Sequence, residues 1–263
     1  MVCMTNYYLP RGMRYTKLEE RRDFYVQQFD LRRVAEWISK TRGRIVYAVI
    51  IGRHTGIYLE KYKEDASTTV IIDEYRDLND LRDQIVEFLP EAVYYDRNVY
   101  DNKGRKKGQE LAFDLDPENI KCPIHGNLAD KMKRGQGLGF CKLELEKIEE
   151  QVVDLYEHLE GQFSKIQVVY SGRGFHVHIF DSEAYSFDER KRTEIARSVK
   201  ERGFAIDEWV TAGEMRLIRL PYSLNGLVSR IVLPLAKKEL EKFDPVHDKR
   251  CIPDFLDRPK VTS

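Results

Sequence analysis

Cysteine is scarce in this chain, long apolar runs are missing, and no segment has the composition of a secretion signal. Only 4 cysteines are spread along the 263 residues. Without a signal peptide or an apolar stretch long enough to cross a bilayer, the sequence predicts a cytoplasmic protein in a reducing compartment, with no membrane attachment.

An excess of either charge is also missing. Lysine plus arginine and aspartate plus glutamate number 44 each, so the formal net charge is zero. The chain as a whole has no basic signature of nucleic-acid binding, and such a role needs a local patch. Candidate patches are the group Lys103, Arg105, Lys106 and Lys107 and the run from Lys131 to Arg134. The alternative is that both are solvated loops.

Repeats and low-complexity tracts are absent, and what remains is a mixture of helical and strand patterns. Helical spacing covers 18–40, broken near Phe29 and Asp30, and 77–90, 145–159 and 188–203. Strand patterns cover 44–52, 54–64, 67–75, 92–96, 110–116, 165–170, 175–181, 204–211, 215–223 and 229–235. Because helices and strands do not alternate strictly, we expect one α+β domain over 1–263, with mixed or antiparallel sheets flanked by helices.

Two acids share one face of the strand predicted at 110–116. Side chains alternate along a strand, so Leu111, Phe113 and Leu115 point to one side, and Asp114 and Asp116 to the other. A third acid, Asp207, lies in another predicted strand. Three carboxylates at adjacent strand ends form a hard-oxygen site that suits Mg²⁺ or Mn²⁺, which would support nucleotidyl transfer. The alternative for the pair alone is a surface-facing strand edge.

The stretch "SGRGFHVHIF" has the groups that a triphosphate needs. Gly172 and Gly174 allow close approach of the backbone, while Ser171, Arg173 and His176 offer a hydroxyl, a guanidinium and an imidazole. Arg216 and Arg219 follow on another predicted strand as a second cationic arm. The alternatives are a glycine hairpin with two semi-exposed histidines, His176 and His178, and solvated strand arginines.

Residues 119–144 read as an inserted loop that contains Cys122, His125 and Cys141. A connection of ~20 residues is uncommon in a compact domain unless something holds it, and a structural zinc ion would do so. A fourth ligand of the usual type is missing, because position 144 is Glu144. Glu144 or Asp130 could supply an oxygen ligand, and the alternative is two free cysteines.

Taken in order, Asp114-x-Asp116, Ser171-Gly-Arg173-Gly-x-His176 and Asp207 resemble the motifs of the archaeo-eukaryotic primase superfamily. The sequence is most similar to the archaeal and eukaryotic replicative primase small, catalytic subunit. The likeness extends from "RYTKLEERRDFYVQQFD" through "IDEWVTAGEMRLIRLPYSLNG" to "LEKFDP", which is most of the chain.

The resemblance implies a primase-polymerase fold with a zinc knob, and synthesis of short RNA or DNA primers on single-stranded DNA from nucleoside triphosphates. It implies that Asp114, Asp116 and Asp207 bind catalytic Mg²⁺ or Mn²⁺. It further implies that Ser171, Arg173, His176, Arg219 and Asn225 bind the nucleotide. The segment with Cys122, His125 and Cys141 corresponds to the zinc knob. A primase large subunit as heterodimer partner and a nucleoid-associated location are also implied.

Three departures from the family pattern keep other functions open. The run Ser171-Gly-Arg-Gly is one residue shorter than usual, Asn225 replaces a common histidine, and the zinc cysteine is missing at Glu144. A primase-polymerase of plasmid replication or break repair is one alternative. A minimal replicative subunit is also compatible with these departures. Two separate hypotheses are a non-catalytic primase-complex or single-strand-binding subunit that kept the fold, and a different metal-dependent phosphotransferase or nuclease.

Overall fold

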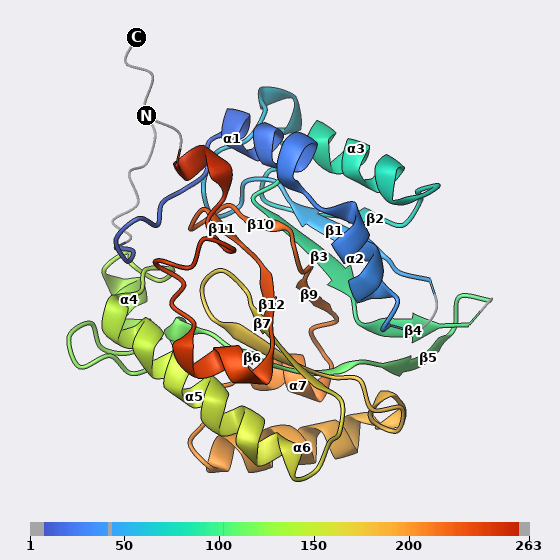
Figure 1. Cartoon of the computed structure of the whole chain (residues 1–263), viewed down its shortest axis with the longest axis vertical. Coiled ribbons are helices and arrows are strands. Elements are labelled where there is room, and N and C mark those ends of the chain that lie inside the picture. Colours follow the sequence, from blue (N-terminus) through green and yellow to red (C-terminus); the bar gives the residue numbers. More distant parts are fainter. Residues whose placement is uncertain (1–7, 42–43, 102, 258–263) are drawn as a thin grey trace.

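The computed structural model describes residues 8–41, 44–101 and 103–257. Two four-stranded antiparallel sheets form its centre, with helices on the outer sides of both (Figure 1). The predicted α+β architecture with antiparallel sheets is therefore confirmed.

The first sheet has the order β2-β1-β3-β9 and the second the order β12-β7-β8-β6. Strands of the first are β1 (Tyr47–Ile50), β2 (Thr69–Ile72), β3 (Ala92–Asp96) and β9 (Leu217–Arg219). Strands of the second are β6 (Leu111–Leu115), β7 (Ile166–Tyr170), β8 (Phe175–Ile179) and β12 (Leu233–Leu235). Two short ladders pair β4 (Asn98–Tyr100) with β5 (Lys106–Gln109), and β10 (Leu224–Asn225) with β11 (Arg230–Ile231).

Helices near the N-terminus cover the first sheet. They are α1 (Leu18–Asp23), which continues as a π-helical turn (Phe24–Gln28), α2 (Leu31–Ile38) and α3 (Leu78–Phe88). The break predicted near Phe29 and Asp30 is confirmed, because the Asp30 carboxylate accepts hydrogen bonds from the backbone of Arg32 and Arg33 and so starts α2.

On the opposite side lie α5 (Lys142–Glu160) and α6 (Glu189–Glu201), with the short α4 (Leu128–Lys133) and α7 (Glu208–Ala212) (Figure 1). Short 3₁₀ turns occur at Glu60–Tyr62, Pro117–Asn119, Ala184–Ser186, Lys237–Lys242 and Asp254–Leu256. Within the described residues, no helix combines the length and apolar character required to span a bilayer.

The alternation predicted for β6 is what joins the sheet to its helices. Leu111, Phe113 and Leu115 are fully buried in one apolar cluster with the inner face of α5. Asp114 is only partly buried, on the other face of the strand. Burial of the apolar face therefore forces the acidic residue toward the space between the two sheets.

Two predicted strands are wrong. Residues 54–64 form turns and a 3₁₀ helix, because the buried Arg21 guanidinium donates hydrogen bonds to the carbonyls of Ile51 and Ile57, each at 3.0 Å. In 204–211, Ile206 makes a single bridge to Leu115, after which α7 begins.

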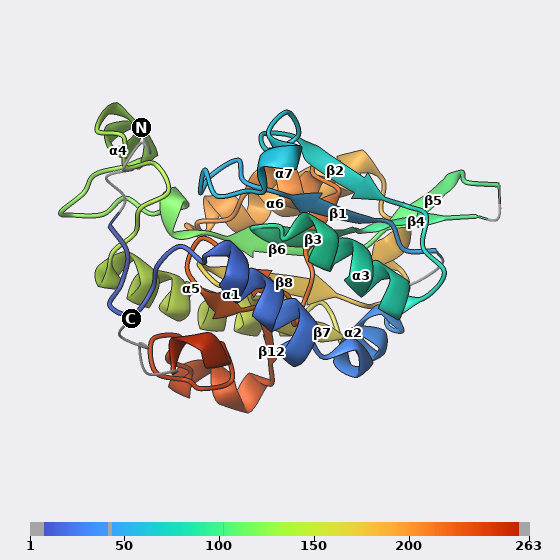
Figure 2. The ribbon, with the colours of Figure 1, turned by 90° about the horizontal axis from the view of Figure 1, so that it is seen from above.

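Two predicted loops contain regular structure that the sequence pattern did not indicate. Residues 106–109, which include Lys106 and Lys107 of the candidate basic patch, pair as β5, and the insertion 119–144 contains α4. Seen from above, the insertion and the β4–β5 hairpin project at opposite ends of the molecule (Figure 2).

Candidate active site

A cavity of about 200 Å³ opens between the two sheets. All of the predicted carboxylates and nucleotide-binding residues line it except Asp207; they are Asp114, Asp116, Ser171, Arg173, His176, Arg219 and Asn225. Residues that are more than one hundred positions apart in the sequence are therefore brought to one concave site.

Backbone pairing fixes the acidic residues relative to one another. Asp114 lies opposite His176 in the β6–β8 register, with Asp114 Oδ1 and His176 Nε2 3.4 Å apart. The backbone N–H of Asp207 donates to the Asp114 carbonyl at 2.8 Å, which holds Asp207 beside the pair. The Asp207 carboxylate accepts from the backbone N–H of Trp209 and caps α7.

Proximity of the acids changes their protonation. The pKa of Asp114 is raised well above its usual value by burial and by the negative charges of Asp116 and Asp207. Burial and the nearby Glu118 raise the pKa of Asp116 to about 6. A divalent cation would offset the free-energy cost of ionising these buried carboxylates, because it favours the ionised form of each.

Two observations fit a metal ion at Asp114 and Asp116. The Oδ1 atom of Asp114 is buried and has no hydrogen-bond partner among the described residues. Carboxylate oxygens are also the ligands that Mg²⁺ and Mn²⁺ prefer. The three aspartates do not form a tight ligand group in this conformation, since such a group is found, in the described part of the chain, only around Cys122.

The glycine turn between β7 and β8 packs directly on the acidic strand. Gly172 has φ +100°, and a Cβ there would lie 2.6 Å from that of Asn225. A Cβ on Gly174 would collide with the Leu115 carbonyl and lie 2.9 Å from Asp116 Oδ1. Both positions therefore require glycine.

Asn225 fixes the same turn. Its amide donates to the Ser171 carbonyl at 2.9 Å, while its Oδ1 accepts from the backbone N–H of Leu227 at 3.2 Å. The Ser171 hydroxyl accepts from the backbone N–H of Gly174 at 3.2 Å. In this conformation both side chains shape the turn that faces the cavity.

Two arginines line opposite walls of the cavity. Arg173 donates to Glu118 Oε2 at 3.0 Å and to the Leu138 carbonyl at 3.3 Å. The Arg219 guanidinium lies 5.0 Å from the ring centre of Tyr94. Arg173 Nε and Arg219 Nη1 are buried and have no hydrogen-bond partner in the described residues, so both are available to an anion.

Two other predicted groups lie elsewhere. Arg216 does not line the cavity and instead pairs with Asp96 at 3.0 Å. His178 is not semi-exposed, because it is fully buried and its Nδ1 lies 2.7 Å from Glu110 Oε1. His176 is also buried, and burial, together with His178, lowers its pKa well below the usual value. His176 is therefore a neutral imidazole at pH 7.

Sequence reasoning missed His54, Tyr94 and Glu118, which also line the cavity. The loop with His54 is held by Glu91, a buried carboxylate that accepts from the backbone N–H of His54 at 3.1 Å and of Thr55 at 2.9 Å. The only local signal is the turn-forming "GRHTG", which does not reveal the distant partner.

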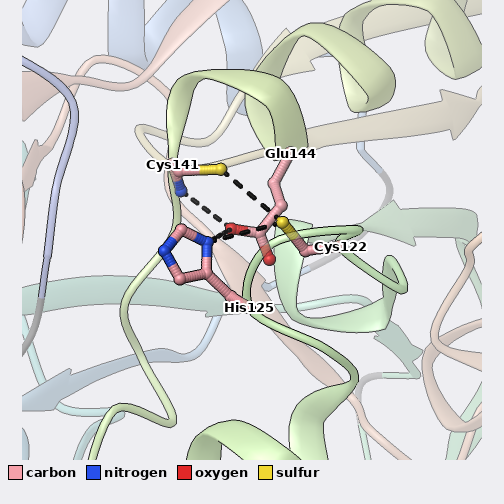
Figure 3. A group of neighbouring side chains, drawn as sticks. All are labelled: Cys122, His125, Cys141 and Glu144. Carbon is pink, nitrogen blue, oxygen red and sulfur yellow. Dashed lines mark hydrogen bonds and ion pairs between the residues drawn. The ribbon is translucent and has the colours of Figure 1, made fainter.

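Four side chains of the insertion converge in a second site. Figure 3 shows Cys122, His125, Cys141 and Glu144 pointing toward one another, and their ligand atoms all lie within 4.8 Å. The Cys122 and Cys141 sulfurs are 3.8 Å apart, and Cys122 Sγ is 3.4 Å from His125 Nδ1. Thiols, an imidazole and a carboxylate are the donors that bind structural zinc. Of the two candidate fourth ligands, Glu144 lies in the group and Asp130 does not.

The two oxygens of the Glu144 carboxylate have different partners. One oxygen pairs with the ammonium of Lys131, and both side chains are fully buried. The other accepts from the backbone N–H of Cys141 at 2.8 Å and faces His125. Lys131 therefore cannot contact nucleic acid, which corrects one member of the predicted patch Lys131–Arg134.

Comparison with known proteins gave no matching family model. An "Uncharacterized DNA primase small subunit-like protein" of Archaeoglobus fulgidus is 50% identical over 267 residues, covering 95% of this chain and 94% of the relative. The DNA primase small subunit PriS of Pyrobaculum calidifontis is 26% identical, covering 64% of this chain and 67% of the relative. PriS of Pyrococcus furiosus is 30% identical over 188 residues, covering 70% of this chain and 48% of the relative.

Among solved structures, the fold matches the polymerase domain of Mycobacterium tuberculosis Ligase D in complex with DNA. The TM-score is 0.53 at 18% sequence identity, and the match covers 92% of this chain and 87% of the other. This likeness concerns the fold. It extends over nearly the whole chain.

Proposed function

This chain belongs to the archaeo-eukaryotic primase superfamily of nucleotidyltransferases, and we propose that it is a DNA primase catalytic subunit that synthesises short RNA or DNA primers on single-stranded DNA. The observation that carries the proposal is the pairing of Asp114 and Asp116, with their raised pKa values, and two arginines with free N–H groups in one cavity. A carboxylate pair of this kind has no structural use, because each acid destabilises the other.

In this proposal Asp114, Asp116 and Asp207 hold the catalytic cations. Bound Mg²⁺ or Mn²⁺ would activate a 3′-hydroxyl and stabilise the pyrophosphate that leaves. Asp114 offers Oδ1, which has no hydrogen-bond partner in the described residues, and Asp116 lies between Asp114 and the glycine turn. His176 is neutral and can donate a hydrogen bond from one ring nitrogen without adding positive charge beside the metal ligands.

The nucleotide would bind on the side of the cavity formed by the glycine turn. Arg173 and Arg219 each direct an unpartnered N–H group that can donate to phosphate oxygens, which are strong acceptors. Ser171 and Asn225 keep the turn in the conformation that leaves room for the triphosphate. The tight packing around Gly172 and Gly174 fixes this wall before a substrate arrives.

The second site is proposed to bind structural zinc through Cys122, His125, Cys141 and Glu144. Family membership also supports a template of single-stranded DNA, nucleoside triphosphates as substrates, and a primase large subunit as heterodimer partner. A cytoplasmic, nucleoid-associated location belongs to the same proposal.

The test is incorporation of labelled nucleotides on unprimed and primed single-stranded DNA, with Mg²⁺ or Mn²⁺. Replacing Asp114 or Asp116 by asparagine removes a metal ligand at nearly constant shape, and we expect at least a hundred-fold loss of primer synthesis. Asp83→Asn, at a carboxylate that is 67% exposed on α3, is the matched control and should retain full activity.

Three results would contradict the proposal. Retained synthesis in Asp114→Asn would overturn the assignment of the acids. Extension of a primed strand without synthesis on an unprimed one would exclude primer initiation and support a role in plasmid replication or break repair. Absence of product with any template, metal or large subunit would support a binding subunit.

A further inference from the structure

The two tryptophans of the chain differ sharply in their surroundings. Trp37 is buried, whereas Trp209 is 62% exposed. Met215, 51% exposed, lies close to it, because the backbone N–H of Met215 donates to the Trp209 carbonyl at 3.2 Å. Two large apolar side chains are thus presented to solvent on the short segment that follows Asp207.

A buried arginine, Arg97, fixes the backbone of the segment that contains Trp209 and Met215. The Arg97 guanidinium donates to the carbonyls of Glu110 at 2.8 Å and Val210 at 2.7 Å, and also to that of Met215. At its start, the backbone N–H of Trp209 donates to the Asp207 carboxylate at 2.9 Å. The backbone of Trp209 is therefore fixed relative to the acidic group, and its exposure is not that of a frayed loop.

Asp207 and the glycine turn lie at opposite edges of the acidic strand, because Leu115 pairs with Phe175 of β8 at one edge and bridges to Ile206 at the other. The turn packs against Asp116, since a Cβ on Gly174 would lie 2.9 Å from Asp116 Oδ1. Asp207 is bonded to the backbone of Asp114 instead. In phosphoryl transfer the attacking and leaving oxygens lie roughly in line on opposite sides of the phosphorus. With the triphosphate on the side of the turn, the attacking hydroxyl approaches from the side of Asp207.

We propose that Trp209, with Met215 beside it, stacks on a base at the 3′ end of the strand that supplies this hydroxyl. The inference rests on the proposed function and adds a surface for one substrate strand. Stacking on an aromatic ring tolerates any base, because every base has a π-face. The adjacent Glu208 carboxylate lies 3.8 Å from Lys200 Nζ, so its charge toward the strand is partly offset.

A binding experiment without catalysis tests the inference. Tryptophan fluorescence is followed while a short single strand is added in the absence of nucleotide, using an intact strand and one with an abasic 3′-terminal residue. We expect the intact strand to quench Trp209 and to bind about 5- to 160-fold more tightly than the abasic one, in line with the usual strength of base stacking. In Trp209→Ala, followed by anisotropy of a labelled strand, this difference should disappear.

Equal affinity of wild type for the two strands would overturn the inference, as would a difference that persists in Trp209→Ala. In steady-state assays Trp209→Ala should raise KM for the primed strand by roughly ten-fold with little change in KM for the nucleotide. Trp209→Phe should restore most of the affinity, and Val26→Ala, at another exposed apolar side chain, should have no effect.

The two proposals fail separately. A wild-type protein that prefers the intact strand but incorporates no nucleotide contradicts the proposed function and leaves the stacking surface in place. An active enzyme with the same KM for the strand in wild type and in Trp209→Ala contradicts the stacking surface alone.

Discussion

Asp116 prefers to keep its proton in the folded chain, which has a defined consequence for stability. Its pKa is raised from 3.8 to about 6 by burial and by Glu118. Between these values the folded state binds more protons than the unfolded state, so the free energy of unfolding falls as the pH rises through this window. The loss is complete above about pH 6, and it concerns the metal-free protein.

We therefore predict that Asp116→Asn stabilises the metal-free protein at pH 7.5 while abolishing nucleotide incorporation. The shift in pKa corresponds to less than about 3 kcal/mol, and partial exposure of the carboxylate reduces the expected gain to about 1–2 kcal/mol. Thermal unfolding in the presence of a chelator should show Tm raised by roughly 2–8 °C.

The same comparison has two internal controls. Well below pH 3.8 the gain should vanish, because Asp116 is then protonated in both the folded and the unfolded state. Adding Mn²⁺ should stabilise wild type more than the variant, since the variant lacks one ligand. If Asp116→Asn is no more stable than wild type at pH 7.5 in chelator, ionised Asp116 does not destabilise the folded protein.

At the scale of single elements, periodicity predicted most of what the structure contains. The alternation in β6 separated Asp114 from Leu111, Phe113 and Leu115 correctly, and the stripe from Leu145 to Leu159 was correctly expected to form α5. These elements were predictable because one buried face fixes the pattern of each.

The errors occur where a distant side chain replaces local pairing. The Arg21 guanidinium donates hydrogen bonds to the carbonyls of Ile51 and Ile57. Asp207 caps a helix within a segment whose composition favours a strand. His54 reaches the cavity only because Glu91 bonds its backbone. No local pattern encodes such contacts, which explains why these parts of the site were missed.

The buried pair of Lys131 and Glu144 could not be predicted either, because the insertion has no strong periodicity. The pair makes the proposed fourth zinc ligand, Glu144, depend on a lysine that is not itself a ligand. The other Glu144 oxygen accepts from the backbone N–H of Cys141 at 2.8 Å and would bind the metal through its remaining lone pair, as ligands with outer hydrogen-bond partners do.

We predict that Glu144→Cys alone weakens the protein although it supplies a common zinc ligand. It leaves the Lys131 ammonium buried without its partner, which typically costs about 3–5 kcal/mol. The double change Lys131→Met and Glu144→Cys should recover stability and bind zinc through three sulfurs and His125. Metal content by mass spectrometry and thermal unfolding measure both effects. If Glu144→Cys alone matched wild-type stability, the buried ion pair would carry no such cost.

At the scale of the molecule, zero net charge requires any contact with a template to be local. Two of the proposed basic residues on the β4–β5 hairpin are partly neutralised, since Asp101 lies 2.8 Å from Arg105 and 3.8 Å from Lys107. Lys133 is exposed on the insertion, and Lys106 lies on the hairpin, which projects at the opposite end (Figure 2). Template binding should therefore draw on few charges at two separate places.

We predict that Lys133→Ala and Lys106→Ala each reduce the salt dependence of binding to a long single strand. For single strands, each neutralised phosphate contributes about 0.7 to the slope of log K against log salt. Each variant should lower the slope by about that amount, and the double variant by the sum. Fluorescence anisotropy over a range of KCl concentrations measures the slopes.

Lys237→Ala is the matched control, because that ammonium is already paired with Glu160 at the end of α5. Its slope should equal that of wild type. An unchanged slope in the Lys133 variant would remove the insertion from the path of the template, and the same result for Lys106 would remove the hairpin.

Arg173 connects the two proposed sites, since it lines the cavity while donating to Glu118 and to the Leu138 carbonyl, near the two ends of the insertion 119–144. If bound zinc orders the insertion and fixes Arg173, zinc raises the affinity for a triphosphate. By linkage, a bound triphosphate then raises the affinity for zinc by the same factor. Nucleoside triphosphate should thus slow the loss of zinc to a chelator in wild type but not in Arg173→Lys.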